Sequence, residues 1–292
     1  MATLRPSRLL LTLGLALGLA VPGATAQQNI LTRSITEAKL RTVLPAPGAW
    51  HPFPRAAERE AWLRLPEAVR AGYIKAGEKL LGGEWPTPKA SVFLDFVRDG
   101  NRSRFEEASF GRRARLAELV LAECAEGRGR FLDDIADGIW TICEESFWGV
   151  PAHVGAQKRG SGLPDITEPV VDLFAAETGM MLAWIDYLLA DKLDAVSPLL
   201  RERIRIETRR RILTPCLERD DFWWMGFGGK VVNNWNPWIA SNWLAAVLLL
   251  ADDFSTFPPE EPQGQIHPGQ GGVLDGVIQR GGRGSRHGVA RQ

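Results

Sequence analysis

The apolar residues of this chain recur at helical spacing from Arg55 to about residue 252, and no convincing alternation of period two occurs before that point. In the segment 167–189, for example, one stripe repeats at intervals that match a helix: Val171, Phe174, Ala175, Thr178, Leu182, Ile185 and Leu189. Each such segment has one apolar face that another helix must cover. We therefore expect an all-α fold.

Glycines and prolines divide this region into a series of expected helices. They cover 57–81 (kinked or split at Pro66), 91–98, 105–125, 130–147, 167–189 and 197–214. Thr167 is the expected N-cap of its helix, and Pro215 follows the last one. More than four helices in succession fit an α/α toroid or a helical solenoid better than a four-helix bundle. The periodicity does not separate these two.

Residues 1–26 have the features of a secretory signal peptide. Arg5 and Arg8 precede the apolar run Leu9–Val21, and an A-x-A cleavage site follows at 24–26. We expect a mature chain in a periplasmic or secreted location, with a retained N-terminal anchor as the alternative. Residues 27–54 form a proline-rich lead-in segment with one helical turn at 36–41.

The composition changes abruptly at residues 253–292. From Phe254 onward the chain has no lysine, tryptophan or tyrosine and is rich in glycine. Such a composition buries too little apolar surface to offset the entropy of ordering, so we expect disorder. Because the change follows an apolar helical segment directly, we interpret it as a shifted reading frame, with a natural disordered tail as the alternative.

The overall charge is balanced, with 35 basic and 35 acidic residues. This balance favours neither nucleic acid nor a membrane surface as a partner. The three cysteines are too few and too scattered for a disulfide framework or a zinc site. We expect no metal and no cofactor.

The stretch 221–250 concentrates tryptophan and asparagine. Flat aromatic rings lie well against the C–H faces of sugars, and amides bind hydroxyl or carboxyl groups. Asn236 is the expected N-cap of a helix with Pro237 in its first turn. Asn233 and Asn234 would then lie in the preceding loop, at the end of the helix that attracts anions. The alternative is a Trp-rich core whose indole N–H groups are satisfied by neighbouring asparagines.

A second informative stretch is 143–155, CEESFWGVPAHVG. Glu144 and Glu145 end a helix, and Phe147, Trp148 and His153 occupy the loop that follows. An acid, aromatic rings and an imidazole this close together indicate a binding rim. The alternatives are a loop histidine that binds backbone and at least one glutamate that is simply solvated.

Three runs in this sequence resemble those of heparinase II/III-like family proteins: ESFWGVPAHV (145–154), LPDITEPVVDLFAAETGMMLAW (163–184) and VNNWNPWIASNWLAAVLLL (232–250). The resemblance extends from roughly Ile35 to Asp252. Members of that family combine an N-terminal α/α toroid with a C-terminal antiparallel β-sandwich. The resemblance therefore implies that residues 55–252 form an incomplete α/α toroid from which the β-sandwich is missing.

The resemblance also implies polysaccharide lyase activity, a β-elimination on an acidic, uronic-acid-containing polysaccharide. One group neutralises the uronate carboxylate, a tyrosine or histidine removes the C5 proton, and a tyrosine protonates the leaving oxygen. By resemblance, Asn233 and Asn234 are the catalytic amides that face the carboxylate. The residues implied to bind substrate are Trp148, His153, Glu145, Trp224, Trp235, Asn236 and Trp238.

The sequence also departs from the family pattern. Trp235 stands where the well-studied lyases have a histidine, and no tyrosine follows the Asn-Asn motif. We therefore expect a truncated copy with little or no activity. Two alternatives are a non-catalytic carbohydrate-binding toroid and a glycoside hydrolase that uses Glu145 with Asp221.

Overall fold

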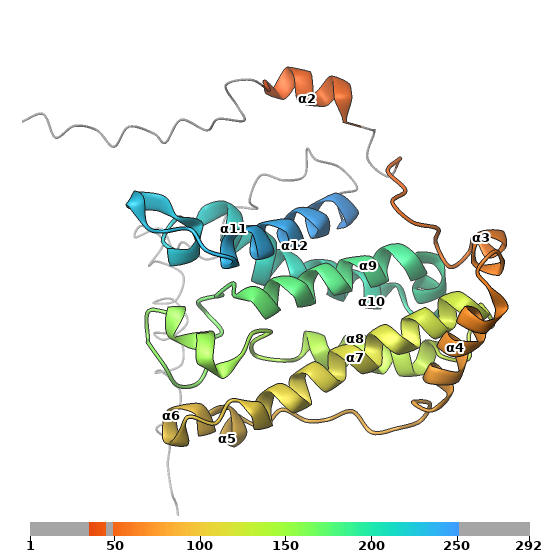
Figure 1. Cartoon of the computed structure of the whole chain (residues 1–292), viewed down its shortest axis with the longest axis horizontal. Helices are drawn as coiled ribbons and strands as arrows, with labels where there is room; N and C mark the ends of the chain where they lie inside the picture. The colour runs from red at the N-terminus through yellow and green to blue at the C-terminus, as the bar shows by residue number, and fades with distance from the viewer. Residues whose placement is uncertain (1–34, 45–48, 251–292) are drawn as a thin grey trace, which may run out of the picture. The chain divides into compact units, whose positions relative to one another are not determined.

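A computed structural model describes residues 35–44 and 49–250 (Figure 1). Every regular element in these two ranges is helical, so the all-α prediction is confirmed. The expected signal peptide (1–26) and the expected disordered tail (253–292) lie outside the described residues. The chain divides into two compact units between Ala49 and Trp50. The first contains α2 (Glu37–Val43), whose N-cap Thr36 accepts a hydrogen bond from the Lys39 backbone N–H.

The second unit contains all the other helices of the described residues. In chain order they are α3 (Arg59–Leu63), α4 (Glu67–Glu78), α5 (Ala90–Phe93), α6 (Asp95–Asp99), α7 (Ser103–Glu126), α8 (Leu132–Cys143), η1 (Pro151–Ala156), α9 (Leu173–Val196), α10 (Pro198–Thr208), η2 (Arg209–Leu213), α11 (Thr214–Glu218), η3 (Trp223–Met225), η4 (Phe227–Gly229) and α12 (Trp235–Leu250). The element η2 is a π-helix, and η1, η3 and η4 are 3-10 helices.

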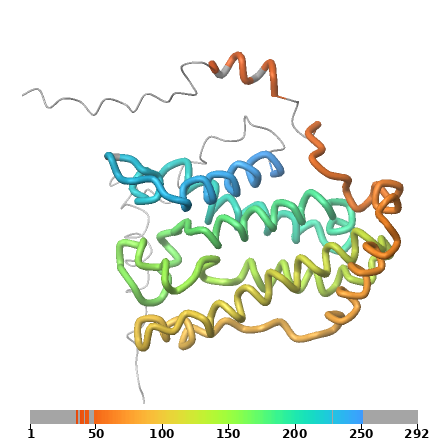
Figure 2. Tube along the Cα trace, viewed as in Figure 1, coloured from red at the N-terminus to blue at the C-terminus, as the bar shows by residue number. Residues whose placement is uncertain are grey.

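The long helices of this unit form two layers (Figures 1 and 2). Helices α7, α9 and α12 lie side by side in one layer, and α8 and α10 lie behind them. Helix α9 contacts members of both layers, and more than half of its residues are buried. It is long and apolar enough to cross a membrane, but 67% of its apolar window is buried by the rest of the protein. Its apolar character is thus accounted for by a central place in the helical core.

Several predicted helix boundaries are confirmed and others are wrong. Pro66 splits the first long helical segment into α3 and α4, as predicted. The segment predicted as 130–147 ends earlier, at Cys143. Helix α9 begins at Leu173, and its N-cap is Asp172, whose carboxylate accepts from the Ala175 N–H at 2.7 Å. Thr167 lies in the preceding turn instead, where its hydroxyl donates to Asp165.

The segment predicted as 197–214 does not end before Pro215. Pro198 occupies the first turn of α10 as expected. A π turn then follows at Arg209–Leu213, and the chain continues helically as α11 through Pro215. A proline inside a helix has no N–H to donate and clashes with the carbonyl four residues earlier. The wider π turn directly before Pro215 changes this hydrogen-bond pattern, which explains why the helix continues.

Candidate functional site

A histidine–aspartate dyad connects η1 to the start of α9. The Nδ1 atom of His153 lies 2.8 Å from Oδ2 of Asp172, which is fully buried. An ionised carboxylate only accepts hydrogen bonds, so Nδ1 carries the proton and Nε2 of a neutral ring keeps its lone pair. No hydrogen bond from residues 35–44 or 49–250 reaches Nε2. His153 can therefore accept a proton from a ligand.

The loop between α8 and η1 holds this dyad in place. Val150 donates its backbone N–H to Oδ2 of Asp172 at 3.2 Å. A Cβ atom on Gly149 would lie 2.5 Å from both carboxylate oxygens of Asp172, so the backbone passes closer than any other residue type allows. The same carboxylate thus caps α9, binds the loop and orients the imidazole.

Aromatic rings enclose the His153 side chain, which is 14% exposed. On one side the ring of Phe174 in α9 stacks almost parallel to it, with centroids 5.8 Å apart. On the other side, the ring of Trp235 at the start of α12 contacts the imidazole edge to face, with ring centroids 4.5 Å apart. Trp223 of η3 lies 4.9 Å from Trp235 and is 37% exposed. These contacts bring α9, α12, η1 and η3 together around one imidazole.

A second acid lies one helical turn farther along α9. Oε1 of Glu177 accepts a hydrogen bond from the indole Nε1–H of Trp238 at 2.9 Å. The pKa of Glu177 is raised, first because the side chain is partly buried and then because of the Asp172 charge, while the Trp238 bond acts in the opposite direction. The Trp238 ring itself is 40% exposed. We refer to His153, Asp172, Phe174, Glu177, Trp223, Trp235 and Trp238 as the His153 cluster.

The asparagines near α12 differ in their surroundings. Asn233 and Asn234 are exposed in the loop before the helix, as predicted. The Oδ1 atom of Asn233 accepts the Trp235 backbone N–H at 3.0 Å. The prediction that Asn236 caps α12 is wrong, because the helix begins at Trp235. Asn236 instead donates through Nδ2 to the carbonyl of Trp224 at 3.2 Å and so holds η3 against α12.

Two of the tryptophans expected to bind sugar are buried in the core. Trp148 is 1% exposed, donates to the carbonyl of Ile142 at 2.8 Å and lies under the Arg211 guanidinium. Trp224 is also buried and donates to the carbonyl of Val171 at 3.0 Å. Neither ring has a free face for a ligand. The alternative was a tryptophan core in which asparagines satisfy the indole N–H groups. These two indoles differ from it, because each donates to a backbone carbonyl.

Glu145 is likewise held by the fold. Its carboxylate is 2.8 Å from Nη2 of Arg113 and 3.1 Å from Nη1 of Arg112, and all three side chains are largely buried. Arg113 also donates to Thr178 in α9 at 2.8 Å. Glu145 therefore joins α7, α8 and α9, and its contacts are with arginines rather than with the His153 cluster. Asp221, the other acid of the hydrolase alternative, is paired with Arg219 at 2.8 Å.

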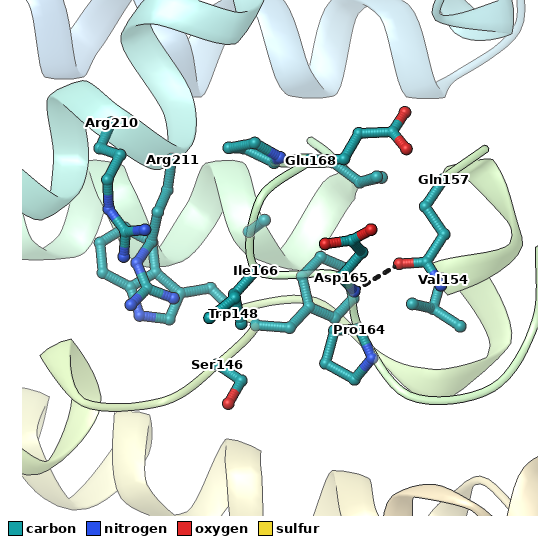
Figure 3. A pocket seen from close by; sticks show the side chains of 14 residues that line it. Ser146, Trp148, Val154, Gln157, Pro164, Asp165, Ile166, Glu168, Arg210 and Arg211 are labelled. Atoms are coloured by element: carbon teal, nitrogen blue, oxygen red, sulfur yellow. Dashed lines mark hydrogen bonds between the residues drawn. The ribbon is translucent and has the colours of Figure 1, made fainter. Parts of the chain in front are cut away.

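Three cavities of the described part of the chain have no lining residue from the His153 cluster. The smallest, about 30 Å³, has room for little more than a water molecule and runs beside Trp148, Arg210 and Arg211 (Figure 3). Another, of about 430 Å³, is lined by Glu144, Glu145 and residues of α5 and α7. A third, of about 360 Å³, lies between α11 and α12.

Sequence reasoning missed three members of the cluster: Asp172, Phe174 and Glu177. Asp172 is of a residue type that favours the N-cap and stands directly before an apolar run, a signal that Thr167 obscured. Phe174 was assigned to the buried stripe of its helix, although its ring also faces His153. Glu177 carries no motif, and only the approach of α12 makes it a candidate.

No protein-family model matches this chain, and no curated protein matches it significantly. Within residues 35–44 and 49–250, no group of three or more histidine, cysteine, aspartate or glutamate side chains has the arrangement of a metal site. The three cysteines are free, and burial raises the pKa of each thiol to about 12.

Proposed function

We propose that this protein is a secreted polysaccharide lyase of the heparinase II/III-like type with weak activity, which acts by β-elimination on uronic-acid-containing glycans at the His153 cluster. The observation that carries the proposal is the dyad: a histidine whose Nε2 has no hydrogen-bond partner among the described residues, fixed by a buried aspartate and flanked by Trp235. We further propose that the paired helices of 55–252 are part of an α/α toroid.

The roles follow from the chemistry of the reaction. The proton on C5 of a uronate is weakly acidic, and neutralising the adjacent carboxylate makes it more so. Asn233 and Asn234, exposed at the N-terminus of α12, are placed to donate to that carboxylate, where the helix dipole also favours an anion. Nε2 of His153 then removes the proton. Trp223 and Trp235 supply ring faces for the sugar.

The test is an incubation with uronate polymers, followed through the ultraviolet absorbance of the C4=C5 double bond in the product. Wild type should form unsaturated product at a low rate, because Trp235 stands where the family has a histidine and no tyrosine follows the Asn-Asn motif. His153→Ala should reduce that rate by about 10²–10⁴-fold. A polymer whose carboxyl groups have been reduced to alcohols is the matched control and should give no product. Absence of unsaturated product from every uronate polymer would overturn the lyase proposal.

The alternative is a non-catalytic carbohydrate-binding protein, which the exposure of Trp223 and Trp238 favours. It predicts affinity for the same polymers without turnover. Trp235→Ala and Trp238→Ala should each weaken binding, measured by calorimetry, whereas Trp140→Ala, an exposed tryptophan on α8, should not. Unchanged affinity in both cluster variants would exclude this alternative.

A further inference from the structure

The proposed elimination needs a second proton transfer, because the sugar oxygen that leaves C4 departs as an alkoxide unless it is protonated. The described part of the chain has no tyrosine near His153 that can serve. Tyr73 lies on α4, and the hydroxyl of Tyr187 donates to the carbonyl of Phe53 at 2.6 Å. Asp172 is fully buried and already holds Nδ1 of His153.

Glu177 has the required position. Phe174 and Glu177 are three residues apart on α9, and Trp235 and Trp238 are three residues apart on α12, so each pair occupies one helix face. The first members of both pairs contact His153, and the second members contact each other. Glu177 therefore lies about one helical turn, roughly 5 Å, along α9 from the imidazole, on the line where α9 meets α12.

The surroundings of Glu177 also differ from those of Asp172, the other acid of the cluster, and from those of Glu145. Its Oε1 accepts the Trp238 indole N–H, and no other hydrogen bond to the carboxyl group occurs within the described ranges. No arginine or lysine of those ranges forms an ion pair with it, in contrast to Glu145. Partial burial and the Asp172 charge raise its pKa, which favours the protonated form.

From this geometry we infer that Glu177 is the general acid of the reaction, an assignment that rests on the proposed lyase function. Nε2 of His153 takes the C5 proton, and the C5–H electron pair forms the C4=C5 bond. The C4–O bond breaks, and its electron pair stays on the leaving oxygen. Glu177 gives its proton to that oxygen and becomes a carboxylate, so a proton passes from His153 to Glu177 through solvent before the next turnover.

The leaving group provides the test. Glu177→Gln keeps the size of the side chain and an acceptor for the Trp238 N–H but has no acidic proton. It should lower kcat on the natural polymer by about 10²–10⁴-fold. On a uronate whose C4 carries fluoride or a nitrophenyl ether, which leaves without protonation, the loss should be less than about tenfold. Glu202→Gln, an exposed glutamate on α10, is the matched control and should behave as wild type on both substrates.

The outcomes separate the two proposals. If wild type forms no unsaturated product from either substrate, the lyase function itself fails. If wild type is active but Glu177→Gln loses activity equally on both substrates, or loses none, Glu177 is not the acid. Trp238→Phe provides a second variant that removes only the indole N–H. The ratio of its rates on the two substrates should stay much closer to the wild-type ratio than that of Glu177→Gln. An equal change of this ratio in both variants would assign the effect to Trp238 instead.

Discussion

The two stretches 143–155 and 221–250 each contribute to a tryptophan–glutamate set, Trp148 with Glu145 and Trp238 with Glu177 of α9, and the two sets are in opposite situations. The indole of Trp148 donates to a backbone carbonyl and is buried, whereas that of Trp238 donates to a carboxyl group and is 40% exposed. Glu145 binds two arginines, whereas Glu177 binds an uncharged indole. Trp148 and Glu145 thus join helices, whereas Trp238 and Glu177 are only partly covered and remain accessible to a ligand.

The largest expected effect concerns Asp172, which binds Val150 and His153 of the first stretch. Asp172→Asn keeps an N-cap acceptor for the Ala175 N–H, since asparagine caps about as well as aspartate. It removes the charge that holds the proton on Nδ1 of His153, and in a comparable triad this change lowers kcat by about 10⁴-fold. We expect a similar loss of lyase rate with a stability change of about 1 kcal/mol, measured by urea denaturation.

A matched variant tests the cause of that loss. Asp172→Ala should lose the cap as well and be less stable than Asp172→Asn by about 0.5–2 kcal/mol. If Asp172→Asn unfolds as readily as Asp172→Ala, the carboxylate acts mainly through the fold, and the contrast between the two stretches is weaker than described.

The second prediction compares the two glutamates directly. Glu145→Ala leaves Arg112 and Arg113 buried without their shared partner, which should cost about 3–5 kcal/mol of unfolding free energy. Glu177→Ala removes one hydrogen bond at a partly exposed site and should cost about 1 kcal/mol or less. Glu144→Ala, at the exposed neighbour of Glu145, is the control and should change stability by less than about 0.5 kcal/mol. Equal costs for Glu145 and Glu177 would contradict the distinction.

The third prediction uses the close approach of the loop to the dyad. In Gly149→Ala the new methyl group would meet both Asp172 oxygens and the Phe147 ring, so the variant should lose about 1–3 kcal/mol of stability. A displaced Asp172 should also reduce the lyase rate by up to about 10²-fold. Gly155→Ala is the control, since its nearest neighbour is the Ser161 hydroxyl at 3.2 Å, and full activity in both variants would show that the approach is unimportant.

The smallest expected effect is the dependence of stability on pH. Because the pKa of Glu177 is raised in the folded protein, its contribution to stability is fully present below the pKa of the unfolded chain and is lost as the pH rises through the folded value. The neighbours that set this shift are Asp172, which raises it, and Trp238, which lowers it. Glu177→Gln should therefore flatten the fall in melting temperature above pH 4.5, the ordinary pKa of a glutamate side chain. A steeper fall in the variant would contradict the sign of the shift.

Much of the fold could be predicted because it depends on local sequence. The break at Pro66 and the start of α10 at Pro198 follow from the geometry of proline alone. The start of α9 could not be predicted in this way. Both Thr167 and Asp172 are good caps, and the choice is made by Val150 and His153, which bind Asp172 from a different segment.

The site was predicted less completely, for a related reason. The aromatic rings and amides at 233–238 are visible as a composition, and Trp235 and His153 do lie together. Whether a given tryptophan is exposed depends on which helix covers it, and no local pattern separates Trp148 from Trp238. Glu177 is the extreme case, because its only distinguishing partner lies 61 residues away in the sequence.

The π turn at Arg209–Leu213 has a consequence for changes in chain length. A π turn accommodates one residue more than an α turn. The helices on its two sides therefore keep their buried faces toward the core, and the extra residue is contained within the turn. Removing one residue here would restore ordinary α geometry and leave α10 and α11 in register. The same deletion in the middle of α10 would rotate one half of the helix by about 100° and expose its buried face. A deletion at this turn therefore keeps the buried face of α10, but Pro215 would then lie in an unbroken α-helix, which costs about 3 kcal/mol.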